Sequence, residues 1–151
     1  MDTNYIKQNG QLVVESKIDD DFKGFDDEML FSLFNGQYWI QKTYKYWYHY
    51  AYMPNIKIYA LKGTHYLTIE GQIEFVEVKQ ISEVIEATIT NDFNGWSGDT
   101  IFELDNGQVW QQNEYDYQYN YSYRPKAIIY DNGYGHKILV EGEKVGIKRI
   151  K

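Results

Sequence analysis

The sequence predicts an all-β protein made of two tandem, small, partly open barrels of SH3-like type, with OB-like barrels as the alternative. Three observations support this prediction. A segment that joins an Asn-Gly turn to alternating tyrosines occurs twice, short strand-like runs recur between turn residues, and helical periodicity is almost absent. Five or six strands in about 65 residues, one of them long and bent, favour an SH3-like barrel over an immunoglobulin-type sandwich.

An internal repeat indicates the domain organisation. At a fixed offset of 71 residues, 20 of the 50 positions in residues 22–71 are identical to their counterparts in residues 93–142. We therefore predict an N-terminal arm over residues 1–11, a first repeat over 12–81 and a second repeat over 82–151. The arm is expected to be loose or to add an edge strand. No linker rich in proline, glycine or serine separates the repeats, so we expect them to abut.

Each repeat is expected to consist of strands joined by short turns. In the first repeat, apolar alternation places the strands at 12–18, 29–34, 37–52, 56–61, 66–70 and 73–81. The first strand ends in the acidic run 19–21, and a loop over 21–28 follows, with Gly24 as its turn residue. Asn35-Gly36 is a strong hairpin signal, and Pro54 ends the third strand because proline cannot donate to a ladder. At 16 residues that strand is too long to stay flat, so we expect a bend near Lys42-Thr43.

The third strand of each repeat carries a tyrosine at every second position, which places five rings on one face. We call these two sets the tyrosine combs: Tyr44, Tyr46, Tyr48, Tyr50 and Tyr52 in the first repeat, and Tyr115, Tyr117, Tyr119, Tyr121 and Tyr123 in the second. The favoured interpretation of most of these rings is structural, as the wall of a small core or a contact between the repeats. The functional alternative is an aromatic platform for a peptide, a sugar or single-stranded bases. A ribbon of this length is longer than a small core can cover, so the remaining rings are expected to be exposed or to contact another surface.

Trp47 lies out of phase with the first comb, on the face where the second repeat has Gln118. A large apolar residue on a polar face indicates a contact, either with another part of the chain or with a partner molecule. We treat Trp47 and its neighbour His49 as candidate anchors of an intermolecular interface.

Two further pairs of residues match between the repeats. Trp39 and Trp110 follow the Asn-Gly turns and are predicted to be core anchors. Gln41 and Gln112 are less easily explained by packing. Their amides could brace the following turn or face a ligand, and the sequence leaves both interpretations open.

Composition and charge narrow the function classes. The chain has no cysteine, which excludes disulfides as support for the small cores. Buried aromatic rings are expected to stabilise the cores instead, because the aromatic content is 18%. The net charge is −7, divided as −3 over residues 1–81 and −4 over residues 82–151, so duplex nucleic acid is not an expected partner. The sequence begins without a basic segment followed by an apolar run, so we expect no membrane partner and a cytoplasmic location.

Catalytic signals are few. The three histidines are His49, His65 and His136, and no nucleophile motif, phosphate-binding glycine loop or H-E-x-x-H motif is present. The acidic run at 19–21 begins like a calcium loop, but Lys23 and Leu30 occupy positions where an EF-hand requires oxygen ligands. We therefore predict no enzyme activity, no metal and no cofactor.

The second repeat contains F-N-G-W-S-G-D-T-I-F-E-L-D-N-G-Q-V-W-Q-Q, followed by Y-x-Y-x-Y-x-Y-x-Y-x-P. This combination resembles a repeat found in small, uncharacterised bacterial proteins. The resemblance covers residues 89–131 and, more loosely, residues 18–60, where Phe25 replaces the tryptophan of the motif. It supports the existence of the module and implies no particular activity.

The sequence therefore predicts a non-catalytic protein that binds a protein or peptide through exposed rings. The candidate contact residues are Trp47, Tyr44, Tyr46, Tyr48, His49, Gln41, Gln112, Tyr115 and Tyr117. A carbohydrate-binding or glycan-processing accessory role, with an acidic loop beside the rings, is the first alternative. Self-association into a homo-oligomer, through an exposed strand edge or ring patch, is the second.

Overall fold

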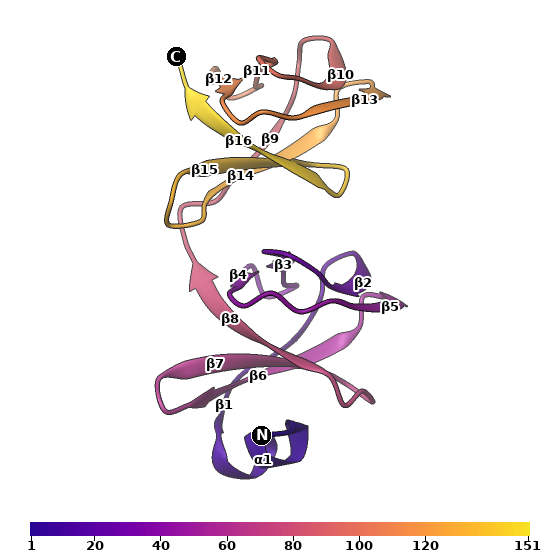
Figure 1. The fold of residues 1–151 in the computed structure, drawn as a ribbon, viewed down its shortest axis with the longest axis vertical. Coiled ribbons are helices and arrows are strands. Elements are labelled where there is room, and N and C mark those ends of the chain that lie inside the picture. The colour runs from indigo at the N-terminus through magenta and orange to yellow at the C-terminus, as the bar shows by residue number, and fades with distance from the viewer. The chain divides into compact units, whose positions relative to one another are not determined.

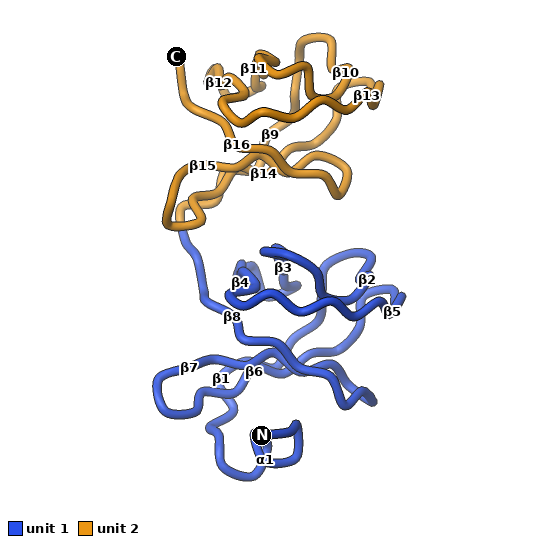
Figure 2. The backbone as a smooth tube through the Cα atoms, in the orientation of Figure 1, with its two compact units in different colours: residues 1–82 blue, residues 83–151 orange.

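The computed structural model describes residues 1–151, which divide into two compact units, Met1–Ser82 (unit 1) and Glu83–Lys151 (unit 2) (Figure 2). Both units are built almost entirely from antiparallel strands that curl around a core of their own (Figure 1). The predicted all-β, barrel-like fold is confirmed.

The two units contain the same succession of strands, and unit 1 adds a short helix before them. The elements of unit 1 are α1 (Thr3–Asn9), β1 (Gln11–Lys17), β2 (Asp21–Phe25), β3 (Leu30–Ser32), β4 (Tyr38–Gln41), β5 (Trp47–Tyr52), β6 (Asn55–Leu61), β7 (Thr64–Ile69) and β8 (Phe75–Ile81). Those of unit 2 are β9 (Ile85–Thr88), β10 (Phe93–Ser97), β11 (Ile101–Glu103), β12 (Val109–Gln112), β13 (Tyr117–Ser122), β14 (Lys126–Asp131), β15 (His136–Val140) and β16 (Glu143–Arg149).

Six strands of each unit form one curled antiparallel sheet. Its order is β1-β6-β7-β8-β4-β3 in unit 1 and β9-β14-β15-β16-β12-β11 in unit 2, so the two units share one topology. The two ends of the sheet meet at an isolated bridge, Ile18 with Leu33 in unit 1 and Ile89 with Leu104 in unit 2. Each sheet therefore closes over a short distance only and forms a partly open barrel.

The remaining two strands of each unit form a separate antiparallel ribbon, β2–β5 in unit 1 and β10–β13 in unit 2. The prediction of a loop over residues 21–28 is wrong here, because β2 lies within that range. Phe22 and Phe25, 3% and 2% exposed, anchor β2 in the core, and β5 is the strand with which it pairs. The long third strand breaks over residues 42–46, at the predicted bend, so β4 joins the barrel and β5 joins the ribbon.

A bulge in each ribbon brings two backbone segments into close approach. A Cβ atom on Gly24 would lie 1.8 Å from the carbonyl oxygen of Trp47, and one on Gly95 would lie 1.9 Å from that of Gln118. Both glycines also have a positive φ, +101° and +93°. Only glycine combines this conformation with so close a contact, which explains its presence at both bulges.

The core of each barrel contains one of the two predicted tryptophan anchors. Trp39 and Trp110 are each 3% exposed, which confirms that prediction. The indole N–H of each donates to a glutamine side chain two residues earlier, Gln37 at 3.1 Å and Gln108 at 3.0 Å. The Asn-Gly dipeptides lie in the β3–β4 and β11–β12 connections, as the hairpin signal predicted.

Residues 3–9 form α1 in place of the loose arm or edge strand expected at the N-terminus (Figure 1). The Asp2 carboxylate caps the helix by accepting a hydrogen bond from the backbone N–H of Tyr5 at 2.9 Å, and Ile6 is fully buried. The Thr3 hydroxyl donates to the carbonyl oxygen of Ile73. A single buried isoleucine is too short a periodic signal to predict a seven-residue helix. No helix of the structure has the length and apolar character needed to cross a membrane.

Candidate functional site

The tyrosine combs lie on the outer face of the ribbons and of the bends that precede them. All ten rings are exposed, with exposed fractions of 55–68% in unit 1 and 60–86% in unit 2. The expectation that most of them form the wall of a core is therefore wrong. In β5 it is the alternate, non-tyrosine positions that are partly buried, and in β13 two of the three such positions are.

Trp47 is one of these inward-facing side chains and is not an exposed anchor. Its ring centroid lies 5.1 Å from that of Phe25 and 6.2 Å from that of Phe22. The ring of His49 stacks on Trp47 with the two planes 3° apart and the centroids 5.0 Å apart. The interface role expected of Trp47 and His49 is not supported, because their contacts lie within unit 1.

Unit 2 achieves similar packing with a tryptophan on the opposite strand of the ribbon. Phe25 and Trp47 are cross-strand neighbours in unit 1, and Trp96 and Gln118 occupy the matching positions in unit 2. Trp96 is 5% exposed, and its ring centroid lies 5.7 Å from that of Phe93. Each ribbon therefore carries one tryptophan packed against the core, which explains why Gln118 can stand where the first repeat has Trp47.

Gln41 and Gln112 brace the bends that lead into the combs. Their side chains are almost fully buried, with residue exposures of 1% and 3%. The Gln112 side-chain oxygen accepts hydrogen bonds from the backbone N–H groups of Ser97 (3.2 Å), Gly98 (3.0 Å) and Thr100 (3.4 Å). Its side-chain nitrogen donates to the backbone carbonyls of Glu114 (2.9 Å) and Asp116 (2.8 Å). Gln41 makes bonds that match those to Ser97, Glu114 and Asp116: its oxygen accepts from the Asp26 N–H, and its nitrogen donates to the carbonyls of Thr43 and Lys45. Its nitrogen also donates to the Asp26 carbonyl, a bond without a counterpart in unit 2. The structure thus favours the bracing interpretation over the ligand-facing one.

A further hydrogen bond holds the same bend in each unit, with its two partners at swapped positions. The Thr43 hydroxyl donates to the Glu77 carboxylate at 2.8 Å in unit 1. In unit 2 the corresponding residues are Glu114 and Gly146, and the Gly146 backbone N–H donates to the Glu114 carboxylate at 2.9 Å. This hydrogen bond, together with Lys137 at 3.2 Å, lowers the pKa of Glu114. The carboxylate that accepts the hydrogen bond therefore belongs to the barrel in unit 1, as Glu77, and to the bend in unit 2, as Glu114.

An acidic residue lies beside the first comb on the neighbouring strand. Asp21 of β2 is the cross-strand neighbour of Tyr52 and accepts a hydrogen bond from the Tyr50 hydroxyl at 3.0 Å. That hydrogen bond and the negative charge of Asp21 raise the pKa of Tyr50. The matching residue of unit 2 is Asp92. Asp21 was not predicted as a site residue, because the acidic segment that contains it was interpreted as a solvated loop. An aspartate directly precedes the matching phenylalanine in each repeat, at Asp21-Phe22 and Asp92-Phe93.

The predicted contact residues separate into two groups. Tyr44, Tyr46, Tyr48, Tyr115 and Tyr117 are exposed, whereas Trp47, His49, Gln41 and Gln112 are engaged within their own units. The prediction omitted the exposed rings at the far end of each comb: Tyr50, Tyr52, Tyr119, Tyr121 and Tyr123. These tyrosines follow the same two-residue period as the predicted ones, so the sequence pattern was sufficient to include them.

The other histidines lie against the core tryptophans. The ring centroids of His65 and Trp39 are 5.2 Å apart, and those of His136 and Trp110 are 5.0 Å apart. These contacts match between the units and give both rings a packing role. No group of three or more histidine or acidic side chains is arranged to hold a metal ion.

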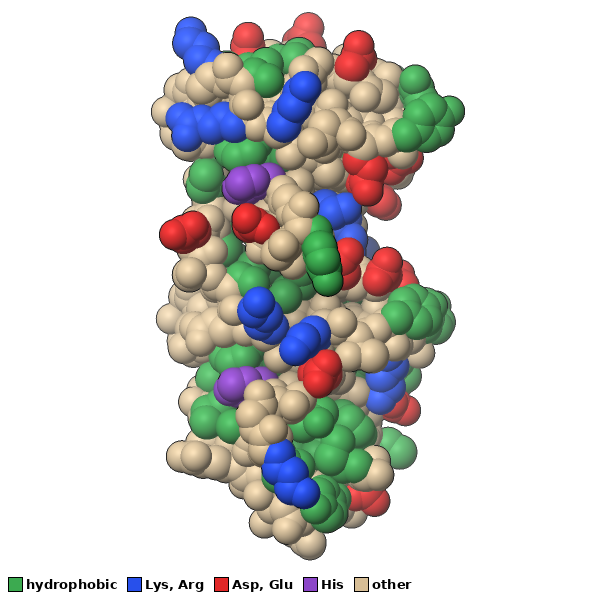
Figure 3. Space-filling model, turned by 60° about the vertical axis from the view of Figure 1, so that its left-hand side comes forward, with side chains coloured by type: hydrophobic (Ala, Val, Ile, Leu, Met, Phe, Trp, Pro, Cys, Tyr) green, Lys and Arg blue, Asp and Glu red, His purple; other side chains and the backbone are tan.

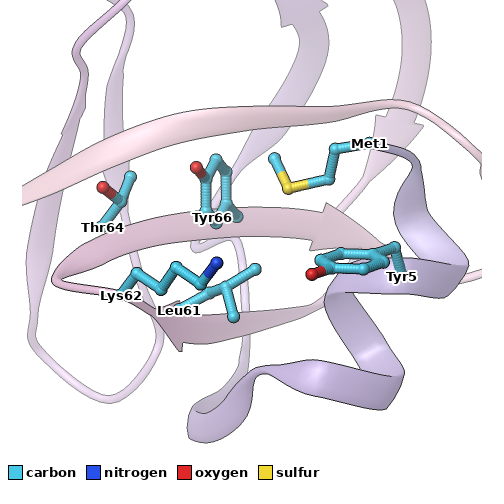
Figure 4. A pocket seen from close by; sticks show the side chains of 6 residues that line it. All are labelled: Met1, Tyr5, Leu61, Lys62, Thr64 and Tyr66. Carbon is cyan, nitrogen blue, oxygen red and sulfur yellow. The ribbon is translucent and has the colours of Figure 1, made fainter.

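A surface hollow of about 380 Å³ lies between α1 and the β6–β7 hairpin of unit 1 (Figure 4). It is lined by Met1, Tyr5, Leu61, Lys62, Thr64 and Tyr66. Hydrophobic side chains gather in this lower part of unit 1 in the space-filling view (Figure 3). The lining offers one charged side chain, Lys62, and Met1 is itself 65% exposed, so the hollow lacks the enclosure of a typical ligand pocket. The combs are the better candidate site.

Comparison of the chain with protein families, with curated proteins and with solved structures finds no match. The functional interpretation therefore rests on the geometry of the combs and of the ribbons that carry them.

Proposed function

We propose that this chain is a non-catalytic binding protein whose tyrosine combs recognise an extended segment of another protein. The observation that carries the proposal is the exposure of all ten comb tyrosines. Six of them lie on β5 and β13, whose other face is largely turned toward a core. Single exposed apolar residues are ordinary, but a row of rings along one face is typical of a contact surface.

Each comb exposes enough area to serve as one side of an interface. At roughly 200 Å² for a fully accessible tyrosine, exposures of 55–68% leave on the order of 640 Å² in unit 1. The same estimate for exposures of 60–86% leaves on the order of 730 Å² in unit 2. Both values approach the roughly 800 Å² that one partner contributes to a standard interface. Tyrosine supplies this area at low entropic cost, because its side chain has few rotatable bonds.

An extended peptide matches the spacing of the three comb tyrosines on each of β5 and β13. Side chains two residues apart on a strand are separated by about 6.8 Å, and the same spacing applies to an extended partner. Each ribbon contains two strands only, so β5 and β13 each have one edge without a neighbouring strand. Backbone pairing along this edge and side-chain contacts with the rings can act together, as they do when a peptide adds a strand to a sheet.

Selection from a random dodecapeptide display library tests the proposal. The wild-type chain is the bait, and the counter-bait carries serine in place of Tyr48, Tyr50, Tyr119 and Tyr121, which are exposed and lie outside both cores. We expect peptides that bind the wild type at least tenfold more tightly than the counter-bait. If no peptide is selected, or if every selected peptide binds both baits equally, the combs are not a peptide site.

The same two baits distinguish the alternative functions. A glycan panel that binds the wild type and not the counter-bait would assign the combs to carbohydrate. A concentration-dependent mass in light scattering that the serine substitutions abolish would assign them to self-association.

A further inference from the structure

The ribbons and their flanking turns hold the entire net charge of the chain. Residues 19–28 and 42–52 of unit 1 contain six acidic and three basic side chains. The matching residues 90–99 and 113–123 of unit 2 contain four acidic side chains and no basic one. These four segments sum to −7, the charge of the whole chain, and the other residues balance with twelve acidic and twelve basic side chains. The negative charge is therefore concentrated on the segments that carry the combs.

Much of this charge is not neutralised within the ribbons. The aspartates at the start of β2 and beside the start of β10 are exposed and form no ion pair: Asp19, Asp20, Asp21 and Asp92. Lys45, the one basic residue between comb tyrosines, is engaged elsewhere. Its amine lies 3.0 Å from the Glu74 carboxylate and donates to the carbonyl oxygen of Phe75 at 2.7 Å.

A carboxylate lies beside one ring of the first comb. Asp21 contacts the first comb directly, through the hydrogen bond that the Tyr50 hydroxyl donates to it at 3.0 Å. Asp92 is the residue of unit 2 that matches Asp21 in the repeat, and it directly precedes β10. A cation over a tyrosine face at this end of the ribbon therefore meets a carboxylate at the same place, and the two attractions add.

We infer that the occupant of the combs is an extended, arginine-rich segment of a partner protein. This inference rests on the proposed function and adds the chemistry of the partner. The guanidinium of arginine is planar, stacks on aromatic rings and binds a carboxylate through two parallel N–H groups, whereas lysine offers a compact, strongly hydrated charge. Arginines at every second position of an extended segment repeat at about 6.8 Å, the period of the three comb tyrosines on each of β5 and β13.

The same charge disfavours other occupants. A second copy of this chain would place ribbons of like sign against each other, and nucleic acid would bring phosphates to carboxylates. A neutral glycan would leave the carboxylates without a partner of opposite charge.

Calorimetric titration of the full chain with three synthetic dodecapeptides tests the inference. The probes alternate threonine with arginine, glutamine or glutamate, so they differ in charge and share backbone length. We expect the arginine peptide to bind roughly tenfold more tightly than the glutamine peptide at low salt, and the glutamate peptide to show no binding. The advantage of the arginine peptide should shrink at about 0.3 M salt, because exposed charges are screened.

A matched pair of charge variants locates the effect. One replaces Asp19, Asp20, Asp21 and Asp92 with asparagine, and the control replaces four exposed glutamates outside the ribbons, Glu15, Glu83, Glu103 and Glu143, with glutamine. Both remove the same charge. We expect the aspartate variant to weaken binding of the arginine peptide roughly tenfold and the control to weaken it less than about twofold. Equal weakening by both variants would show that net charge attracts the peptide and would overturn the inference.

The serine counter-bait separates this inference from the proposed function. If the arginine and glutamine peptides bind alike and both lose affinity for the counter-bait, the inference fails while the peptide-binding function stands. If the arginine peptide binds the counter-bait as tightly as the wild type, the rings take no part in its recognition and the inference fails. If the arginine peptide does not bind at all, the inference is overturned, and the library selection decides on the function alone.

Discussion

Replacing Gln112 with leucine tests whether a buried amide holds the second comb in position. The substitution keeps a side chain of similar volume but removes the bonds to three backbone N–H groups at 3.0–3.4 Å and two backbone carbonyls at 2.8–2.9 Å. A buried backbone group without a partner costs about 1–3 kcal/mol. The turn and the bend can recover part of this by opening to water, so we expect a loss of roughly 2–4 kcal/mol in the free energy of unfolding. A unit of this size has a total stability of about 3–10 kcal/mol.

Urea unfolding followed by tryptophan fluorescence measures this loss, and NMR hydrogen exchange of the Ser97 and Gly98 amides reports on the turn itself. The matched control is Gln111→Leu, one residue earlier on the same strand. Gln111 is only partly buried, and its side chain donates a single long hydrogen bond of 3.5 Å. We expect the control to change stability by less than about 0.5 kcal/mol. Equal stability of the two leucine variants, with unchanged exchange at Ser97 and Gly98, would refute the bracing role of Gln112.

Three further predictions follow from the differences between the units and from the ribbon geometry. Trp47→Gln should destabilise unit 1 by about 2–3 kcal/mol, and adding Phe25→Trp, which copies unit 2, should restore at least about 1 kcal/mol; a double-mutant cycle by denaturation without this recovery would contradict the exchange. Glu114→Gln should cost less than about 1 kcal/mol at pH 7, because the carboxylate is half exposed. Since the pKa of Glu114 is lowered in the fold, its stabilisation is present above its ordinary value of 4.5 and is lost as the pH falls below it, so the two proteins should converge near pH 3 in thermal unfolding. Gly107→Ala should lower the free energy of unfolding, measured by urea denaturation, by about 1–2 kcal/mol. The loss comes from the positive φ alone, since no atom lies within 4 Å of the added Cβ. Gly95→Ala should cost at least about 2 kcal/mol more, because its Cβ meets a carbonyl oxygen at 1.9 Å; similar losses for the two alanine variants would contradict the close approach.

The repeat, the hairpin turns and the core tryptophans could be predicted because each depends on local information. An Asn-Gly pair suits a tight turn wherever it occurs, and a tryptophan at matching positions of two repeats indicates a core anchor. The ribbon strand β2 could not be predicted in this way. Residues 21–25 lack strict alternation because a bulge at Gly24 shifts the register, and their strand state depends on pairing with β5, which follows more than 20 residues later.

The bracing glutamines and the helix α1 depended on contacts that no sequence pattern encodes. Gln41 and Gln112 were recognised as unusual from their recurrence, but an amide looks the same in sequence whether it meets backbone groups or a ligand. The structure resolved this by burying both side chains among backbone partners. Residues 3–9 are helical because Ile6 is buried against the barrel of unit 1, and that packing surface exists only once the barrel has folded.

The sequence by itself determined that the tyrosines of β5 share one face and that those of β13 share one face, since the side chains of a strand alternate. Only the tertiary structure decided that this face is the outer one. The direction depends on which side of the ribbon fits the barrel: Trp47 packs there in unit 1, while Trp96 does so from the partner strand in unit 2. Because the tryptophan lies on different strands in the two repeats, neither sequence alone indicated the inward face. Packing against a core is a property of the whole fold, so the exposure of the combs became visible only in three dimensions.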